Sequence, residues 1–259
     1  MKNLTRIIFA LSSLLVLLAA FLIFLEIKAI KNSITLFNAA HDSRKTDLKP
    51  VKWITTKDSL IMNAQFRQAF LLAQIEASHA DSIILVINLP DSSAFLSLKG
   101  VTIHTAKIIH FETDPIFMDI NPSAFLYLLS APMTVMHHES SIRKVPLMVK
   151  IAPKDTSEYI PDIQVDTSDS EPVDYFLETR MGIRFCFFDI NKGDFSNRFT
   201  RIKNDLKETI NHHTSQVLLF ASQKEPRYIP SIQLSLTRKD AKIIYRAIPS
   251  NANIILKIK

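Results

Sequence analysis

SIQLSLTRKDAKIIYRAIPSNANIILKI, from Ser231 to Ile258, is the stretch that decides the predicted fold. Its first residues alternate between apolar and polar, which predicts a half-buried strand. Thr237 then supplies a helix cap, and Asp240 stands at the third helical position, a weakened form of the capping box. Pro249 ends the helix, and the apolar run of Asn253–Ile258 predicts a closing strand. The sequence therefore predicts that the chain ends in a strand–helix–strand unit.

Upstream of this unit, short apolar runs separated by turn residues predict a chain of strands with a few helices between them. The polar stretch 152–172 is too long for a simple connection, so it marks either a domain boundary or a flap over a cleft. The predicted helices begin at Ser59, Asn121, Ser196 and Thr237, each a residue that can cap a helix. Predicted strands cover 82–89, 94–100, 101–111, 133–139, 145–151, 174–179, 183–190, 217–222, 229–236 and 253–258.

The N-terminal stretch Ile7–Leu25, IIFALSSLLVLLAAFLIFL, contains no charged residue. As a helix that rises about 1.5 Å per residue, it spans roughly the hydrocarbon thickness of a bilayer. A cleaved signal peptide and a buried helix of a soluble protein are the alternatives. The run is longer than the apolar region of a signal peptide, and no clean Ala-x-Ala cleavage site follows it. We therefore expect an uncleaved membrane anchor.

The charges beside this anchor set its predicted orientation. Lys2 and Arg6 precede it, whereas Glu26 and two lysines follow it. The positive bias on the N-terminal side predicts a cytoplasmic N-terminus and an extracytoplasmic C-terminal domain. The predicted organisation is a cytoplasmic N-terminus at 1–6, a transmembrane helix at 7–25, a stalk or linker at 26–58 and one extracytoplasmic domain at 59–259.

A narrow apolar stripe continues the helical pattern beyond the anchor. Ile27, Ile30, Ile34 and Phe37 recur at helical spacing and would share one face. Two interpretations follow: residues 27–37 form a homodimer seam, or they pack against the chain's own domain. Two heptads are too few to decide for a coiled coil.

Composition excludes several classes of function. The chain has 259 residues and a net charge of +6, and its basic residues are scattered, which gives no nucleic-acid-binding stripe. The basic excess suits either a solvated surface or an acidic partner, such as anionic lipid or wall polymer. Three glycines are too few for a phosphate-cradling loop, so no nucleotide cofactor is expected. With a single cysteine, the exported domain must be held by packing rather than by disulfides.

No metal site is predicted either. His137, His138 and Glu139 are consecutive on a predicted strand, where adjacent side chains point to opposite faces. The two histidines therefore cannot grip one ion if the strand is regular. The sequence also contains no Gly-x-Ser-x-Gly motif for a serine hydrolase.

The C-terminal stretch resembles the end of L,D-transpeptidase catalytic domains. In that family a strand with Ser-His-Gly-Cys-Ile-Arg leads into Leu-Thr-x-x-Asp-Ala, a short helix with Tyr, Val-Pro and a closing strand. The runs at 82–111 and 182–189 resemble the family's first hairpin and its upstream strand, so the resemblance covers about 82–111 and 174–258. The residues that match in type and spacing are Leu236, Thr237, Asp240, Ala241, Tyr245, Ile248 and Pro249.

The departures from the family pattern decide the expected function. In this frame the family's nucleophilic Cys falls on Gln233, its His on Ser231 and its Arg on Ser235, while the His of the upstream strand falls on Cys186. Acyl transfer through a thiolate needs a Cys and a neighbouring base, and a Gln cannot form the acyl-enzyme. The resemblance therefore implies the fold without the activity. These four residues are the expected remnant cleft, with Cys186 buried between two phenylalanines and inert.

The resulting expectation is a mainly β, α+β domain, a transpeptidase-like meander or sandwich with peripheral helices, behind one transmembrane helix. We expect a non-catalytic, single-pass protein of a bacterial inner membrane whose periplasmic domain binds peptidoglycan or an envelope protein. The first alternative is an active cell-wall peptide transferase or hydrolase with rearranged catalytic residues. The second is an unrelated membrane-tethered assembly factor.

Overall fold

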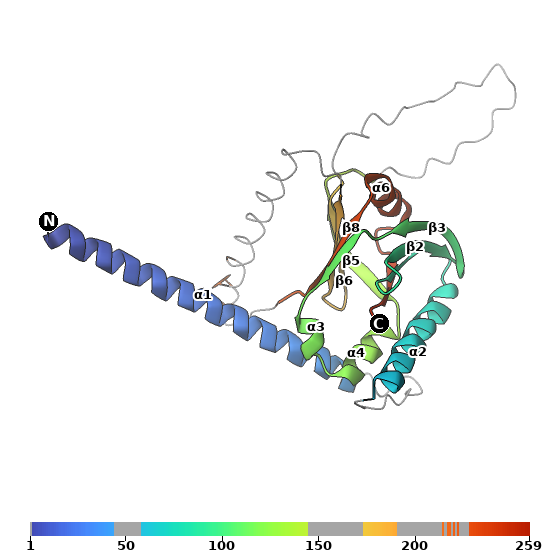
Figure 1. Cartoon of the computed structure of the whole chain (residues 1–259), viewed down its shortest axis with the longest axis horizontal. Helices are drawn as coiled ribbons and strands as arrows, with labels where there is room; N and C mark the ends of the chain where they lie inside the picture. Colours follow the sequence, from blue (N-terminus) through green and yellow to red (C-terminus); the bar gives the residue numbers. More distant parts are fainter. Residues whose placement is uncertain are drawn as a thin grey trace, which may run out of the picture.

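The computed structural model describes residues 2–43, 58–144, 173–190 and 228–259, together with Thr214, Val217, Leu218, Phe220 and Ser222. Within these residues the chain combines helices with a nine-stranded sheet (Figure 1). The elements are α1 (Lys2–Ser43), α2 (Ser59–Ser78), β1 (Ile84–Asn88), β2 (Ser93–Leu98), β3 (Val101–Lys107), β4 (His110–Thr113), α3 (Ile116–Asp119), α4 (Pro122–Leu129), β5 (Met133–Ser140), β6 (Tyr175–Thr179), β7 (Arg184–Asp189), β8 (Ser231–Leu236), α6 (Arg238–Ala247) and β9 (Asn253–Lys257).

The strand order is β3-β2-β1-β9-β5-β6-β7-β8-β4, and its two ends are joined by only Ile108 and Ile109. The N–H of Ile108 donates to Ser92 O at 2.8 Å beside β2, whereas the N–H of Ile109 donates to Ser235 O at 2.9 Å on β8. Two consecutive residues thus bond to opposite ends of the strand order. The sheet therefore closes on itself, with β3 and β4 acting as one strand that passes from one half to the other.

A second strand, β5, joins the two halves at the other corner. Met133 and Thr134 pair with β9, and from Val135 onward the strand pairs with β6. The register shifts between Val135 and His137, and such a bulge bends a strand. One half is therefore β3-β2-β1-β9, and the other is β6-β7-β8-β4. Strands that switch between sheets at bends make the corners of orthogonally packed β-structures.

The space between the two halves holds the main core. Leu85 and Ile254 from one half, and Phe185, Phe187 and the inward residues of β8 from the other, are buried in one cluster. Helix α6 contributes apolar side chains to the same cluster. Truncation of a fully buried phenylalanine costs about 3–5 kcal/mol, so each of the two in β7 is a large part of the stability.

Helix α2 covers the opposite face of β1 and β9. Phe70, Ala73 and Ala77 of the helix pack in a second cluster with Val86 and Ile255. Because β1 is covered on both faces, all five of its residues are buried, which explains why its first four residues are all apolar. The chain is thus a mixed α and β structure, with helices outside and at one end of a closed sheet.

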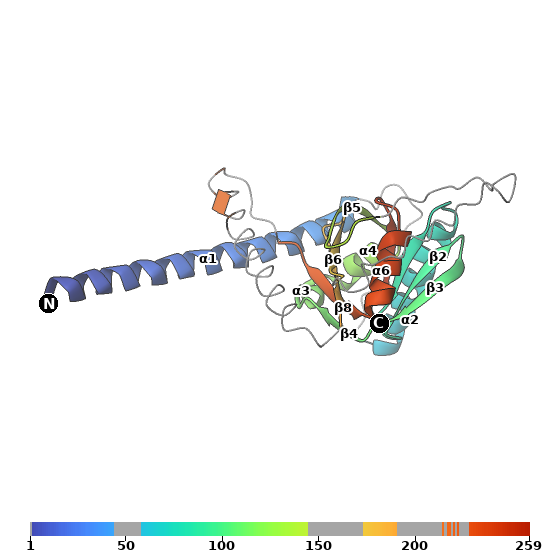
Figure 2. The same ribbon diagram turned by 90° about the horizontal axis from the view of Figure 1, so that it is seen from above.

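Helix α1 does not stop at the end of the apolar run. It continues as one helix to Ser43, so residues 26–43 of the expected stalk are helical, and residues 44–57 lie outside the described part. Ile30, Ile34 and Phe37 pack against the main core, while Ile27 is half exposed. Packing on the chain's own domain, one of the two interpretations, is therefore confirmed for three of the four residues of the stripe. The N-terminal part of the helix projects away from the sheet in both views (Figures 1 and 2).

Several local predictions are confirmed at the level of caps and turns. Asn121 caps α4 by accepting from Ser123 N at 2.9 Å. Thr237 Oγ1 accepts from Asp240 N at 3.2 Å and donates to Asp240 Oδ2 at 2.8 Å. The hairpin of β6 and β7 turns around Gly182, whose φ of 75° is the left-handed region that glycine adopts readily.

Two local predictions are wrong. Asp58, not Ser59, caps α2, because its carboxylate accepts from Leu60 N at 2.9 Å. Of the predicted strand 217–222, the described Val217, Leu218 and Phe220 are helical, and Ser222 N donates to Leu218 O at 2.9 Å, the bond of a helical turn. The predicted strand 145–151, loop 152–172 and helix from Ser196 lie outside the described residues.

Candidate functional site

The four residues of the expected remnant cleft lie together on the outer face of β7 and β8. These strands run parallel, and Cys186 is the register partner of Gln233. In the same register Ser231 pairs with Arg184, and Ser235 pairs with Phe188. The structure therefore brings together residues that are separated by more than forty positions in the chain.

The alternation of β8 explains why these side chains face outward. Ile232, Leu234 and Leu236 are fully buried in the core. Because successive side chains of a strand point to opposite faces, Ser231, Gln233 and Ser235 must lie on the outside. Gln233 is exposed, and the two serines are partly exposed. The burial of the three apolar residues of β8 therefore places its three polar residues on the outer face.

Cys186 is not buried as predicted from its neighbours. It is partly exposed on the outer face, while Phe185 and Phe187 are fully buried on the inner face. The prediction averaged over neighbours along the chain, whereas in a strand those neighbours point the other way. The predicted burial of Cys186 is therefore wrong, and the inertness of its thiol stays a prediction.

The register extends the site into one row across four strands. Phe176 on β6 pairs with Cys186, Cys186 with Gln233, and Gln233 with Glu112 on β4. Neighbouring strands lie about 4.8 Å apart, so the row spans roughly 14 Å. It presents, in order, an aromatic ring, a thiol, an amide and a carboxylate. We call these four residues the outer row.

A charged pair flanks the outer row at its β6 end. Arg184 Nη2 donates to Glu178 Oε2 at 3.2 Å, and the Arg184 guanidinium lies 4.7 Å from the centroid of the Phe176 ring. The His137 ring lies 5.6 Å from the same Phe176 ring. The ion pair is partly buried, and together with the cation–π contact it holds the Phe176 ring and the guanidinium in place.

The outer row offers hydrogen-bonding groups that can recognise a ligand. Gln233 supplies two N–H donors and a carbonyl acceptor, and Glu112 supplies acceptors. In the strand register Cys186 lies between Phe176 and Gln233. The arrangement suits the binding of a ligand with amide and charged groups.

The adjacent histidines lie on opposite sides of β5, as predicted. The His137 ring lies tilted against Phe176 of the outer face, whereas the His138 ring lies edge-on to Tyr245 of α6, at 6.1 Å. Among the described residues, no group of three His, Cys, Asp or Glu side chains is placed to hold a metal ion.

The beginning of β8 is tied to α1. Ser33 Oγ on α1 donates to Tyr228 O at 2.7 Å and accepts from Tyr228 N at 3.1 Å. The Tyr228 hydroxyl donates to Asp114, and Asp114 N donates to Ser231 O at 3.1 Å. Burial, followed by the hydrogen bond to Asp114, raises the pKa of Tyr228 above its ordinary value. The strand that carries Gln233 is thus held at its first residues by helix α1.

Sequence reasoning missed Phe176, Arg184 and Glu112 as members of this face. Phe176 and Arg184 could have been placed there, because their strands were predicted and both alternate with buried residues. Glu112 gave no such signal, since its strand pairs with residues more than a hundred positions later. A comparison with protein-family models, curated proteins and solved structures finds no match for the chain.

Proposed function

We propose that this chain is a membrane-anchored, non-catalytic interaction protein of a bacterial envelope, with a fold like that of L,D-transpeptidases, and that its outer row binds peptidoglycan. The carrying observation is the register pair of Cys186 and Gln233 on adjacent parallel strands. In the family frame these are the positions of a histidine and of the nucleophilic cysteine. The two positions still lie side by side on β7 and β8, but they carry a cysteine and a glutamine in place of a histidine and a cysteine. This replacement favours binding without acyl transfer.

The chemistry of the outer row supports a peptide-bearing polymer as the ligand. Stem peptides carry amides, carboxylates and amines, which the amide of Gln233, the guanidinium of Arg184 and the carboxylate of Glu112 can bind. The net charge of +6 favours the approach of a polyanionic wall. Helix α1, which is long and apolar enough to cross a membrane, would hold the domain beside that wall.

Co-sedimentation with isolated bacterial sacculi tests the proposal on the full chain in detergent micelles. Gln233→Arg places a long charged side chain in the centre of the outer row and should abolish pelleting. Gln68→Arg makes the same change at an exposed position of α2 and should leave pelleting unchanged. Pelleting that is absent in the wild type, or equal in both variants, would show that the outer row does not bind the wall. In the first case an envelope protein remains the alternative partner, to be sought by crosslinking.

The partial exposure of Cys186 favours one second candidate, an active cell-wall peptide transferase or hydrolase with rearranged residues. On this hypothesis the purified chain releases or exchanges a terminal D-amino acid of a stem peptide, and Cys186→Ser abolishes the reaction. Turnover that persists in Cys186→Ser would eliminate the thiol as nucleophile. Turnover that is lost in Cys186→Ser would contradict the non-catalytic proposal.

A further inference from the structure

The apolar surface of α1 leads directly into the domain, with no spacer between them. Up to Phe24 the described side chains of the apolar run are largely exposed, whereas Leu25, Ala29 and Ser33 are buried. From Leu25 to Ser33 is about 12 Å along a helix. If α1 crosses a bilayer as proposed above, the domain therefore lies against the membrane surface.

One described residue, Phe220, contacts α1 on both sides of Leu25, the first buried residue of this junction. The Phe220 ring lies edge-on to Phe21 of α1, with centroids 5.8 Å apart. The ammonium of Lys28 lies 5.4 Å from the centroid of the same Phe220 ring. Phe21 is one helical turn before Leu25, so this contact is about 6 Å inside the end of the apolar run.

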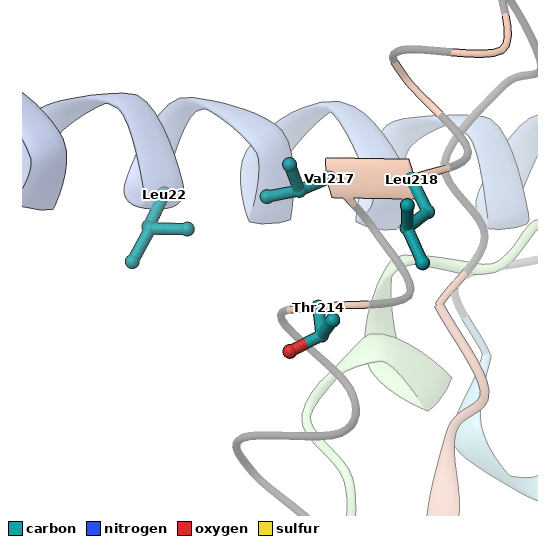
Figure 3. Close-up of a pocket in the computed structure, with 4 residues that line it drawn as sticks. All are labelled: Leu22, Thr214, Val217 and Leu218. Carbon is teal, nitrogen blue, oxygen red and sulfur yellow. The ribbon is translucent and has the colours of Figure 1, made fainter.

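An apolar pocket of about 290 Å³ lies beside this contact (Figure 3). It is lined by Leu22 of α1 and by Thr214, Val217 and Leu218, and in the close-up the side chains of Val217 and Leu218 stand near α1. Leu218 is 64% exposed. In water such a surface would be unfavourable by about 25 cal/mol for each Å² of apolar area.

We propose that Val217, Leu218 and Phe220 insert into the membrane interface beside the last turns of the span, and that a phospholipid acyl chain occupies the pocket. The patch continues the exposed apolar surface of α1 at the depth where interfacial helices bury their apolar faces, about 5–10 Å. Lys28, one turn nearer the domain than Phe24, stands at the level of the phosphates and attracts anionic headgroups. This second contact fixes the orientation of the domain on the membrane. It rests on α1 being the membrane anchor.

Spin-label accessibility in nanodiscs of phosphatidylethanolamine and phosphatidylglycerol tests this proposal on the full chain. In a Cys186→Ser background, labels are placed by Leu218→Cys, Leu17→Cys and Val101→Cys, whose native side chains are 64%, 64% and 65% exposed. We expect the label at 218, like the one at 17, to be accessible to oxygen and protected from a water-soluble nickel chelate. The label at 101, on β3, should show the opposite.

The outcomes separate this proposal from the anchor on which it rests. A label at 218 that behaves like the one at 101, while 17 is protected, would overturn the second contact and keep the anchor. If 17 is as accessible to nickel as 101, the anchor and the contact both fail. Dipolar broadening at 218 that disappears on dilution with unlabelled chain would assign the patch to a second copy and overturn the lipid assignment.

Discussion

Ser33→Ala tests whether α1 is an integral part of the domain. The Ser33 side chain is buried and makes two hydrogen bonds to the backbone of Tyr228, at 2.7 and 3.1 Å. Alanine fills nearly the same space but leaves the N–H and C=O of Tyr228 without this partner. An unsatisfied buried polar group costs about 1–3 kcal/mol, and Tyr228 is only partly buried, so we expect about 1–3 kcal/mol for both groups together.

Thermal unfolding of the full chain in detergent micelles, followed by circular dichroism, measures this loss. For a domain of this size each kcal/mol lowers Tm by about 2–4 °C, so Ser33→Ala should lower Tm by about 2–12 °C. Thr35→Ala is the matched control, because Thr35 is exposed and its hydroxyl bonds to Lys31 O within α1, at 2.9 Å. It should shift Tm far less. An unchanged Tm for Ser33→Ala, or equal shifts for both variants, would refute the docking of α1 through Tyr228.

Three further predictions concern the caps, turns and ionisation of the domain. Thr237→Ala removes the hydroxyl that accepts from Asp240 N and caps α6, and should lower the free energy of unfolding in urea by about 0.5–2 kcal/mol. A smaller loss would show that the cap does not stabilise the helix. Lys99 adopts a φ of 51° in the turn between β2 and β3, so Lys99→Asn should raise the free energy of unfolding in urea by about 0.5 kcal/mol, and a decrease would contradict the turn geometry. The pKa of Tyr228 is raised by burial and by Asp114, so the unfolded chain loses the phenolic proton first as pH rises above about 10. Stability should therefore fall above that pH in the wild type and fall less in Tyr228→Phe, which urea midpoints between pH 8 and 11 would show.

The C-terminal unit was predictable because its signals are local. The alternation in Ser231–Leu236, the cap at Thr237 and the stop at Pro249 each depend on a few neighbouring residues, and each is found in the structure. The same alternation, applied to Phe185–Phe187, would have placed Cys186 on the outer face. The predicted burial of Cys186 is wrong because Phe185 and Phe187, its neighbours in sequence, point to the opposite face of the strand.

The closure of the sheet could not be predicted, because it depends on pairings between distant segments. β1 pairs in parallel with β9 across the length of the domain, and Ile108 and Ile109 bond to different halves. The helical state of Val217 and Leu218 also escaped prediction, because a short apolar run has no period that separates helix from strand. The contact of the nearby Phe220 with Phe21 of α1 depends on tertiary structure.

The proposal that the outer row binds the wall is tested most directly at its own thiol. Cys186 is the one cysteine of the chain and lies in register between Phe176 and Gln233. The measurement is the rate of Cys186 alkylation by N-ethylmaleimide in the full chain, read by mass spectrometry, with and without saturating soluble peptidoglycan fragments. A ligand on the outer row should slow alkylation. An unchanged rate in a preparation that still co-sediments with sacculi would place the binding site elsewhere and contradict the account.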